Sequence, residues 1–399
     1  MKKNLFFGVL FLFVISFVNA QNITLEFNSE KAIKDSGSKT FNGTSALQTV
    51  KDMKTGWNLG NTLDASSSRT LSSETSWGQP MTTKAMIDTL AKSGIKTIRI
   101  PTSWSNHFID RNYTIDPNWM TRVKTIVDWA LENDMYVILN SHHDCYEKPT
   151  VMKKCSGYYP NSTNYEESAR FLLNIWTQIS TAFNNGYDEH LIFETMNEPR
   201  LRGTNNEWWN DINSSTYKDA AETLNKLNQV ALDAIRATGG NNQKRYVMIP
   251  GLRAAVDSAI ANEFKLPKDN SDGKLIISVH MYDPYDFAMQ GGGSFEFKPR
   301  HQSALESTFD KLNTYFVSKG IPVIIGEYGA TNKGNLEERV KWFKFFLSYS
   351  RRYGITSILW DNGGFEPSKK ESEKFGFFDR RALKWRFPEI LDAILESTK

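Results

Sequence analysis

The sequence has few cysteines, no block of like charge and no glycine-rich phosphate turn. Only 2 of its 399 residues are cysteine, and nothing resembles the ligand spacing of a zinc site. Lys and Arg total 48 against 45 Asp and Glu, with no extended basic run, so the charge pattern of a nucleic-acid-binding protein is missing and no nucleic acid partner is expected. Residues 56–60 do not match G-x-G-x-x-G, which argues against a doubly wound nucleotide-binding sheet.

The only long apolar run is at the N-terminus. Two lysines precede an apolar stretch over residues 5–18, and Val18-Asn19-Ala20 resembles a small-residue cleavage site. This pattern predicts a signal peptide over residues 1–20. An uncleaved anchor is the alternative, but the run is shorter than the roughly 20 residues that span a bilayer. We therefore expect a secreted protein, extracellular or periplasmic, with no membrane partner after cleavage.

The two cysteines, Cys145 and Cys155, lie in one polar segment. In an oxidising compartment they could form a local disulfide, which would stabilise the fold by at most about 3 kcal/mol. Two unpaired thiols are the alternative, and the sequence leaves the choice open.

The chain beyond the signal peptide divides into a polar leader and one long patterned region. Residues 21–43 lack sustained periodicity, and we expect them to be loosely ordered. From residue 44 to 399, short apolar runs alternate with longer amphipathic segments, which is typical of repeated βα units. The apolar runs are 55–59, 97–101, 136–140, 191–195, 245–249, 275–279, 322–325 and 356–359. The amphipathic segments are 83–92, 117–132, 165–184, 217–237, 301–318, 336–352 and 388–395, with a shorter one near 254–261.

The number and order of these segments predict an α/β protein with a single (β/α)8 TIM barrel over residues 44–399. Each apolar run is apolar on both faces, as expected of strands enclosed by a ring of helices. Local signals agree with this assignment, because Asp116-Pro117 supplies an N-cap followed by proline at the first helical position. No linker or appended binding module is apparent.

Polar and titratable residues recur directly after the apolar runs, where barrel enzymes carry their active sites. Glu198 follows the fourth run and Glu327 the seventh. Two such carboxyl groups can cleave a glycosidic bond, because one protonates the departing oxygen while the other attacks or activates water. Either glutamate alone fits an exposed loop carboxylate equally well, but together with their polar neighbours they predict chemistry. These neighbours are Asn61, Asp64, Arg99, His142, His143, Asp144, Asn197, His280, Tyr282, Trp360, Asp361 and Asn362.

Tryptophans give a second argument for a sugar substrate. Several lie at or beside predicted strand ends or loops, where an indole face can stack on a sugar ring: Trp57, Trp77, Trp104, Trp208, Trp209 and Trp360. Others lie on predicted helices and are expected to pack against the barrel: Trp129, Trp176 and Trp342. Trp119 fits either interpretation.

The adjacent histidines His142 and His143 raise the question of a metal. Neighbouring strand residues point to opposite faces, so the two rings are not expected to bind one ion unless the strand has already ended. The ligand set is also incomplete for a catalytic metal. We expect no metal and no cofactor.

Taken in order, the motifs resemble those of glycoside hydrolase family five, and the first two are similar to its subfamily four of bacterial endoglucanases and xyloglucanases. The likeness covers about residue 45 to the C-terminus, and it is specific because one motif follows each strand in order. The motifs are Gly56-Trp57-Asn58-Leu59-Gly60-Asn61-Thr62-Leu63-Asp64-Ala65, Glu74-Thr75-Ser76-Trp77-Gly78, Ile98-Arg99-Ile100-Pro101, His142-His143, Phe193-Glu194-Thr195-Met196-Asn197-Glu198-Pro199, His280-Met281-Tyr282, Gly326-Glu327-Tyr328-Gly329 and Trp360-Asp361-Asn362.

The resemblance implies a role for each matching residue. Glu198 would be the general acid/base, held protonated by its surroundings, and Glu327 the nucleophile of a retaining reaction. Arg99 and Tyr282 would keep Glu327 ionised and oriented. The remaining residues would bind the sugar or support the acid/base: Asn197 at the 2-hydroxyl, His142, His143, His280, Asn61, Trp77, Trp208, Trp209, and Trp360 as the floor under the ring.

The expected function is that of a secreted, metal-independent, retaining endo-β-1,4-glucanase. Its partner would be plant cell-wall β-glucan, with cellulose-like glucan, mixed-linkage glucan and xyloglucan left open. An endo-β-mannanase or endo-xylanase on the same fold is one alternative, and a non-catalytic carbohydrate-binding barrel is another. The latter is disfavoured because mere binding does not need Glu198 beside Glu327. We expect a monomer, with these two carboxyl groups about 5 to 5.5 Å apart.

Overall fold

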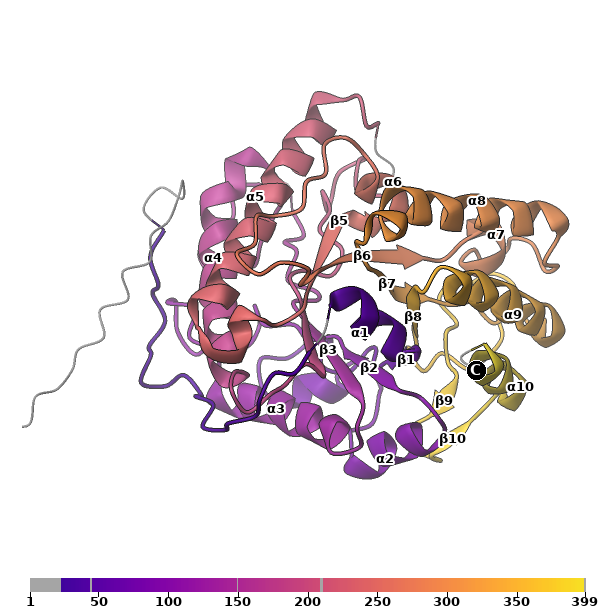
Figure 1. The fold of residues 1–399 in the computed structure, drawn as a ribbon, viewed down its shortest axis with the longest axis horizontal. Helices are drawn as coiled ribbons and strands as arrows, with labels where there is room; N and C mark the ends of the chain where they lie inside the picture. Colours follow the sequence, from indigo (N-terminus) through magenta and orange to yellow (C-terminus); the bar gives the residue numbers. More distant parts are fainter. Residues whose placement is uncertain (1–22, 44, 149, 209–210, 398–399) are drawn as a thin grey trace, which may run out of the picture.

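Eight parallel strands close into a barrel in chain order (Figure 1). The computed structural model describes residues 23–43, 45–148, 150–208 and 211–397, so the predicted signal peptide lies outside the described residues. The strands are β1 (Thr55–Asn58), β2 (Thr97–Ile100), β3 (Tyr136–Asn140), β4 (Leu191–Glu194), β5 (Val247–Ala255), β6 (Leu275–Met281), β7 (Val323–Tyr328) and β8 (Thr356–Leu359). The predicted (β/α)8 barrel and its eight strands are confirmed. Strands β5, β6 and β7 run further than predicted, through register shifts near their ends.

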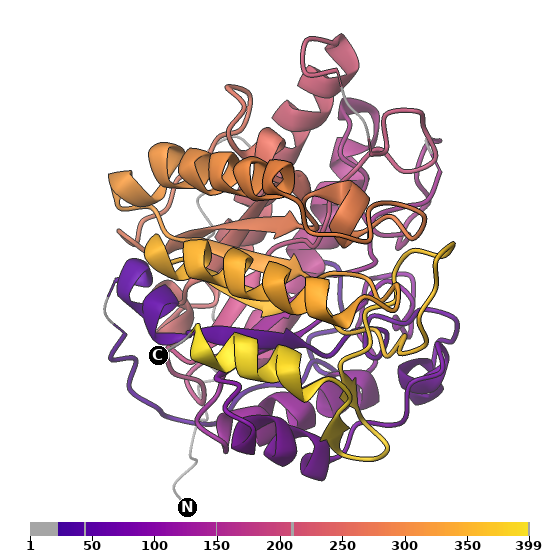
Figure 2. The same cartoon turned by 90° about the vertical axis from the view of Figure 1, so that its right-hand side faces the viewer.

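Helices cover the outside of the barrel, and Figure 2 shows α8, α9 and α10, coloured orange to yellow, side by side across one flank. Their sequences explain their ends: Asp116 caps α3 ahead of Pro117, and Gly320 takes the left-handed conformation that closes the turn after α8. The helices are α1 (Ala46–Asp52), α2 (Lys84–Lys92), α3 (Pro117–Leu131), α4 (Tyr165–Ala182), α5 (Ser215–Ala237), α6 (Val256–Ala259), α7 (Tyr285–Ala288), α8 (Pro299–Tyr315), α9 (Leu336–Arg352) and α10 (Pro388–Glu396). Short 3-10 turns cover Leu71–Thr75, Ser162–Asn164, Gly240–Gln243 and Val317–Lys319, and a small hairpin joins β9 (Phe378–Asp379) to β10 (Lys384–Trp385).

The first helix, α1, closes the N-terminal end of the barrel (Figure 1). Its Ala46 and Val50 pack with inward residues of the strands in one apolar cluster, which includes Ile138, Ile192, Met248, Ile276, Ile324 and Ile358. The neighbours of Ile138 in β3, Val137 and Leu139, belong instead to the cluster under the outer helices. This alternation explains why the strands are apolar on both faces.

The leader is more ordered than its composition predicts. The backbone N–H groups of Glu26 and Phe27 donate to Oδ1 of Asn174 on α4, and the N–H of Asp35 donates to the carbonyl of Thr181. These long-range hydrogen bonds hold residues 23–43 against the outer face of α4.

The two cysteines are not joined. Both thiols are free, and buried Cys145 donates from Sγ to the carbonyl of Arg200 at 3.2 Å. The backbone N–H of Cys155 instead donates to Glu167. The local disulfide is therefore not formed in this structure.

The seam between β1 and β8 is fastened by a buried aspartate. Asp361, directly after β8, accepts hydrogen bonds from Nε1 of Trp57 at 2.9 Å and from the backbone N–H groups of Phe377 and Phe378. Arg380, also buried, donates to the carbonyl of Asp361 at 2.7 Å. The first strand, the last strand and the C-terminal hairpin thus meet at one carboxylate.

Replacing Asp361 by Ala should destabilise the fold by about 3–5 kcal/mol, because four N–H donors lose their acceptor and buried Arg380 loses the negative charge 3.8 Å away. Urea unfolding followed by circular dichroism measures the change. Asp392→Ala, at an exposed position of α10, is the control and should leave the unfolding midpoint in place. Equal midpoints for the two variants would contradict the role of the seam.

Candidate active site

A buried arginine organises the C-terminal mouth of the barrel. Arg99 of β2 donates to Glu194 of β4 (Nε to Oε2, 2.8 Å), to Glu327 of β7 (Nη1 to Oε1, 2.8 Å), to Asn197 (Nη2 to Oδ1, 2.6 Å) and to Asn58 of β1 (Nη1 to Oδ1, 2.9 Å). Burial alone would lower the pKa of Arg99, but the two carboxylates outweigh it and raise the pKa. The guanidinium is therefore a fixed positive charge.

Glu327 is held at both oxygens. Arg99 donates to Oε1, and the hydroxyl of Tyr282 donates to Oε2 at 2.8 Å. Burial and the charge of Glu327 raise the pKa of Tyr282 well above its ordinary value, so this hydroxyl stays protonated and remains a donor. Both donors leave little freedom to rotate the carboxylate of Glu327. Glu327 is thus placed as a nucleophile would be.

Glu198 has different neighbours. Nδ1 of His280 lies 2.8 Å from Oε1 of Glu198 and 3.6 Å from Oε2 of Glu327, and Nη1 of Arg200 donates to Oε2 of Glu198 at 3.3 Å. Burial alone would raise the pKa of Glu198, but the hydrogen bond and charge of His280 and the charge of Arg200 lower it. Burial would lower the pKa of His280, yet both glutamates raise it. These neighbours act against the expectation that the surroundings hold Glu198 protonated.

One proton is therefore shared between His280 and Glu198. The two glutamates raise the pKa of His280, and His280 and Arg200 lower the pKa of Glu198, so both shifts favour the charged form of each group. The 2.8 Å contact lets that proton pass to Oε1 of Glu198. Glu198 can then act as an acid by drawing on His280.

Both adjacent histidines face the mouth, which is the case that the sequence left open for a strand that ends before them. Strand β3 ends at Asn140, so the alternation of a strand no longer applies. Asn140 Nδ2 lies 3.1 Å from Nδ1 of His142, which leaves Nε2 to point towards Oε1 of Glu327 at 3.8 Å. Burial, then the positive charges around it, lower the pKa of His142 well below its ordinary value, so the ring is neutral. Nε2 of His143 lies 3.5 Å from Oδ2 of Asp64.

The two predicted asparagines have distinct settings. Asn197 is buried, and because its Oδ1 accepts from Arg99, its amide N–H2 group points away from the arginine and is available to a sugar hydroxyl. Asn61 lies at the mouth with a φ of 55°, and its backbone N–H donates to Oδ2 of Asp64 at 3.1 Å. This turn positions Asp64 against His143.

Three of the predicted sugar-binding tryptophans lie at the mouth. Trp360 stacks parallel to His142, with ring centroids 5.7 Å apart, and the ring of Trp77 lies 5.3 Å from His143. Trp208 is 47% exposed and covers the guanidinium of Arg200 at 4.3 Å. Trp209 lies outside the described residues.

Two other tryptophans correct the prediction. Trp57 and Trp104 are buried core residues, and each spends its indole N–H on an internal acceptor, Asp361 and the carbonyl of Asn140 respectively. Their large rings sit beside strand ends without reaching the mouth. Trp119, Trp176 and Trp342 are buried beneath the helices, and Trp129 is half-buried there.

Two clusters bring metal-ligand types together. The groups Asp64, His142 and His143, and Glu198, His280 and Glu327, each place one ligand atom per residue within 4.8 Å of the others. Hydrogen bonds account for this proximity: Oδ1 of Asp64 accepts from the N–H of Thr62, and Glu327 is engaged by two donors. A site free of metal stays a prediction.

Sequence reasoning missed Glu194 and Arg200 as parts of the site. Glu194 accepts from Arg99, from Asn140 Nδ2 at 2.9 Å and from Ser278 Oγ at 2.6 Å, so it balances the buried guanidinium. A carboxylate inside the apolar run of β4 was its available signal, because an unpaired buried charge is too costly to keep. No comparable pattern marks Arg200, whose position after a proline resembles any loop residue.

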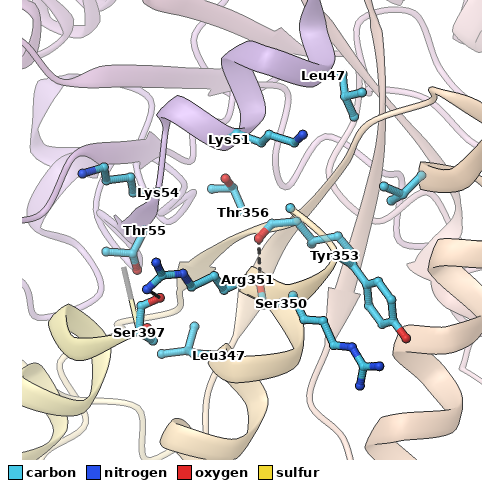
Figure 3. Close-up of a pocket in the computed structure, with 14 residues that line it drawn as sticks. Leu47, Lys51, Lys54, Thr55, Leu347, Ser350, Arg351, Tyr353, Thr356 and Ser397 are labelled. Carbon is cyan, nitrogen blue, oxygen red and sulfur yellow. Dashed lines mark hydrogen bonds between the residues drawn. The ribbon is translucent and has the colours of Figure 1, made fainter. Parts of the chain in front are cut away.

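The cavity in Figure 3 lies far from these residues. It has a volume of about 500 Å³ and is lined by Thr55 and Thr356, the first residues of β1 and β8, together with Lys51, Lys54 and Arg351. It therefore lies at the N-terminal end of the barrel, opposite the paired glutamates.

A pair of glutamates at the mouth of a (β/α)8 barrel, one held by an arginine and a tyrosine and the other by a histidine, is the arrangement of a glycoside hydrolase. The sequence model described as cellulase (glycosyl hydrolase family 5) matches residues 62–366. The chain belongs to this family.

Characterised relatives are similar over most of the chain. Endoglucanase A of Clostridium longisporum is 41% identical over 89% of this chain and 66% of its own length, and endoglucanase B of Ruminococcus albus is 41% identical over 88% and 80%. The structure of a family 5 lichenase mutant from Caldicellulosiruptor sp. F32 with cellotetraose has a TM-score of 0.83 and 45% identity, covering 92% of this chain and 98% of that one. A GH5-4 broad specificity endoglucanase from Ruminococcus champanellensis with cellotriose has a TM-score of 0.81 and 40% identity, covering 90% and 100%.

Replacing Tyr282 by Phe should lower kcat/KM on β-glucan about 10- to 100-fold, because Glu327 loses a charge-assisted hydrogen bond. Initial rates of reducing-end release measure this. Tyr328→Phe is the matched control, since Tyr328 stacks on Phe346 of α9, with centroids 4.9 Å apart, beneath the helices. Equal rates for the two variants would contradict the contact's importance.

Proposed function

We propose that the chain is a secreted, retaining endo-β-1,4-glucanase that hydrolyses internal linkages of cellulose-like glucan, mixed-linkage β-glucan or xyloglucan by double displacement. The observation that carries the proposal is the paired setting of the two glutamates. One carboxylate oxygen of each lies, with a ring nitrogen of His280, within 4.8 Å of the others. This closeness favours the roughly 5 to 5.5 Å carboxyl separation of retaining enzymes over the roughly 6.5 to 9.5 Å of inverting ones.

In the first step, Glu327 attacks the anomeric carbon while Glu198 protonates the glycosidic oxygen. The C–O bond to the leaving sugar breaks, and a glycosyl ester of Glu327 forms. Arg99 and Tyr282 hold the two oxygens of Glu327 in place beforehand, and the proton reaches Glu198 from His280. Asn197 donates to the sugar 2-hydroxyl, where contacts strengthen in the transition state.

In the second step, Glu198 is a carboxylate and removes a proton from water, whose oxygen attacks the anomeric carbon. The ester bond breaks and Glu327 leaves as a carboxylate, so the two inversions give net retention. The proton removed from water restores the Glu198–His280 pair, and the site is ready for another turnover.

The substrate class is supported by the relatives and by the mouth. Proteins about 40% identical are named endoglucanases, and one at 45% identity is named a lichenase. Trp77 and Trp208 are accessible from solvent and come from different segments around the glutamates, which suits a substrate of several sugar units. The loops around the mouth would decide which of the three β-glucans is the preferred substrate.

The proposal of secretion rests on the signal-peptide pattern of residues 1–20. Residues 21–43 would then be a leader, and residues 44–399 would form the catalytic barrel. The protein would act as a monomer. Within the described ranges, the structure contains no helix with the length and apolar character that crossing a bilayer requires. The exported protein would then meet polymeric glucan outside the cell.

The test is reducing-end release by residues 21–399 on carboxymethylcellulose, barley β-glucan, xyloglucan, xylan and mannan, beside Glu327→Ala. We expect activity on one or more glucans, and its loss by a factor of at least about 10⁴ in the variant, because the nucleophile is missing. Circular dichroism establishes that the variant is folded.

Each alternative has its own outcome in this panel. A preference for mannan or xylan would favour the other polysaccharide hydrolases, and glucan binding without hydrolysis would favour a binding barrel. The anomer first released, followed by NMR, should be β; an initial α-anomer would contradict double displacement.

Chelation should leave the rate unchanged, because two carboxyl groups and water suffice for both steps. The assay is repeated on barley β-glucan after dialysis against EDTA, with a calcium- or zinc-supplemented sample as control. A loss of rate that the added metal restores would contradict metal independence.

A further inference from the structure

Arg200 lies between two carboxylates at the edge of the active site. Its Nη1 donates to Oε2 of Glu198 at 3.3 Å, and its Nε donates to Oε1 of Glu207 at 3.1 Å. The side chain of Arg200 is 12% exposed, against 16% for Glu198 and 24% for Glu207. One cation is thus shared between the predicted acid/base and a second glutamate outside the reacting pair.

The contact is shielded from water. The indole of Trp208 lies over the guanidinium at 4.3 Å, and the carbonyl of Arg200 accepts from Sγ of Cys145. Exclusion of solvent strengthens the attraction between Arg200 and both carboxylates, because the local dielectric falls. The backbone N–H of Gly203 holds the other oxygen of Glu207 at 2.9 Å, which fixes this glutamate in place.

Other charged groups also face Glu198, and they define what Arg200 adds. They are His280 of β6, Glu327 of β7, His143 after β3, and Glu373 in the segment after β8. Arg99 faces Glu327 and leaves Glu198 to other partners. Arg200 is the cation in direct contact with Glu198 that does not also bind the nucleophile, so its charge acts selectively on one glutamate.

We propose that Arg200 is a positioning residue that stabilises the carboxylate form of Glu198, and that Glu207 sets the strength of this effect by competing for the same guanidinium. The proposal rests on the proposed function, because it concerns the acid/base of that reaction. Arg200 acts through Glu198. It holds Oε2, while Oε1 faces His280.

The two roles of Glu198 explain why the balance matters. As an acid, Glu198 must give up its proton to the departing oxygen; as a base, it must be ionised to take one from water. A strongly bound cation favours the second role at the expense of the first. The negative charge of Glu207 offsets part of the effect of the guanidinium on Glu198. Glu198 can therefore serve as the acid in the first step and as the base in the second.

The proposal predicts opposite shifts for two single variants. Arg200→Met keeps an apolar stem under Trp208 but removes the charge, so the alkaline limb of kcat/KM on barley β-glucan should move up by about one pH unit. Glu207→Gln leaves Arg200 wholly to Glu198, so that limb should move down by about half a unit. In the double variant, Glu207→Gln should add almost no further shift, because its effect passes through Arg200.

Two control variants distinguish the direct contact between Arg200 and Glu198 from the general effect of a positive charge nearby. Arg202→Gln removes a cation from the same loop, where it pairs with Glu147 and the carbonyl of Cys145, and should not move the limb. Arg200→Lys should restore much of the wild-type limb. With 2,4-dinitrophenyl β-cellobioside, whose leaving group needs no proton, the shift of Arg200→Met in the first step should disappear.

Three outcomes would overturn the proposal. The alkaline limb of kcat/KM could stay unchanged in folded Arg200→Met, the two single variants could shift it in the same direction, or Arg202→Gln could shift it as much as Arg200→Met does. Should Arg200→Met fail to fold, Glu207→Gln and Arg200→Lys carry the test alone, and an upward or absent shift in Glu207→Gln is then the contradicting result. A wild-type protein that hydrolyses none of the five polysaccharides would instead refute the proposed function.

Discussion

The positive charge of Arg99, buried in the mouth of the barrel, is the constraint on which the site depends. A guanidinium without water is tolerated only if carboxylates and hydrogen-bond acceptors surround it, and here Glu194, Glu327, Asn58 and Asn197 do so. These partners come from three further strands or their ends. The buried guanidinium therefore links these strands at the mouth of the barrel, where the chemistry would take place. The proposed nucleophile, Glu327, is one of the groups that balance its charge.

The barrel interior is divided between two kinds of packing. At the N-terminal end, α1 and inward residues such as Ile138 and Ile324 form an apolar plug. At the other end, the same strands carry Glu194, His280 and Glu327, whose hydrogen bonds replace apolar contacts. Stability thus comes from one half of the interior, which frees the other half to hold charges that a folded protein would otherwise avoid.

The strands could be predicted because each is apolar on both faces, and Glu198 and Glu327 because they follow such apolar runs in the sequence. The roles of Trp57 and Trp104 could not, since proximity to a strand end says nothing of whether a ring turns inward or towards solvent. Helix α1 was not predicted, because seven residues are too few to show a clear helical periodicity of apolar residues. The role of Arg200 could not be predicted either, because it depends on contacts with Glu207 and Trp208. The path of a loop brings these residues together, and that path has no recognisable pattern in the sequence.

The fastening of the barrel at Asp361 also has a consequence for synthesis. The first strand is made early, yet its partner β8 and the hairpin that surrounds Asp361 come from the last part of the chain. Seven strands can pair in chain order, but β1 keeps one edge open until the C-terminal segment is in place. A chain released early, or cut near residue 360, would carry that exposed edge permanently, so aggregation of truncated products is inherent in a closed sheet whose ends meet last.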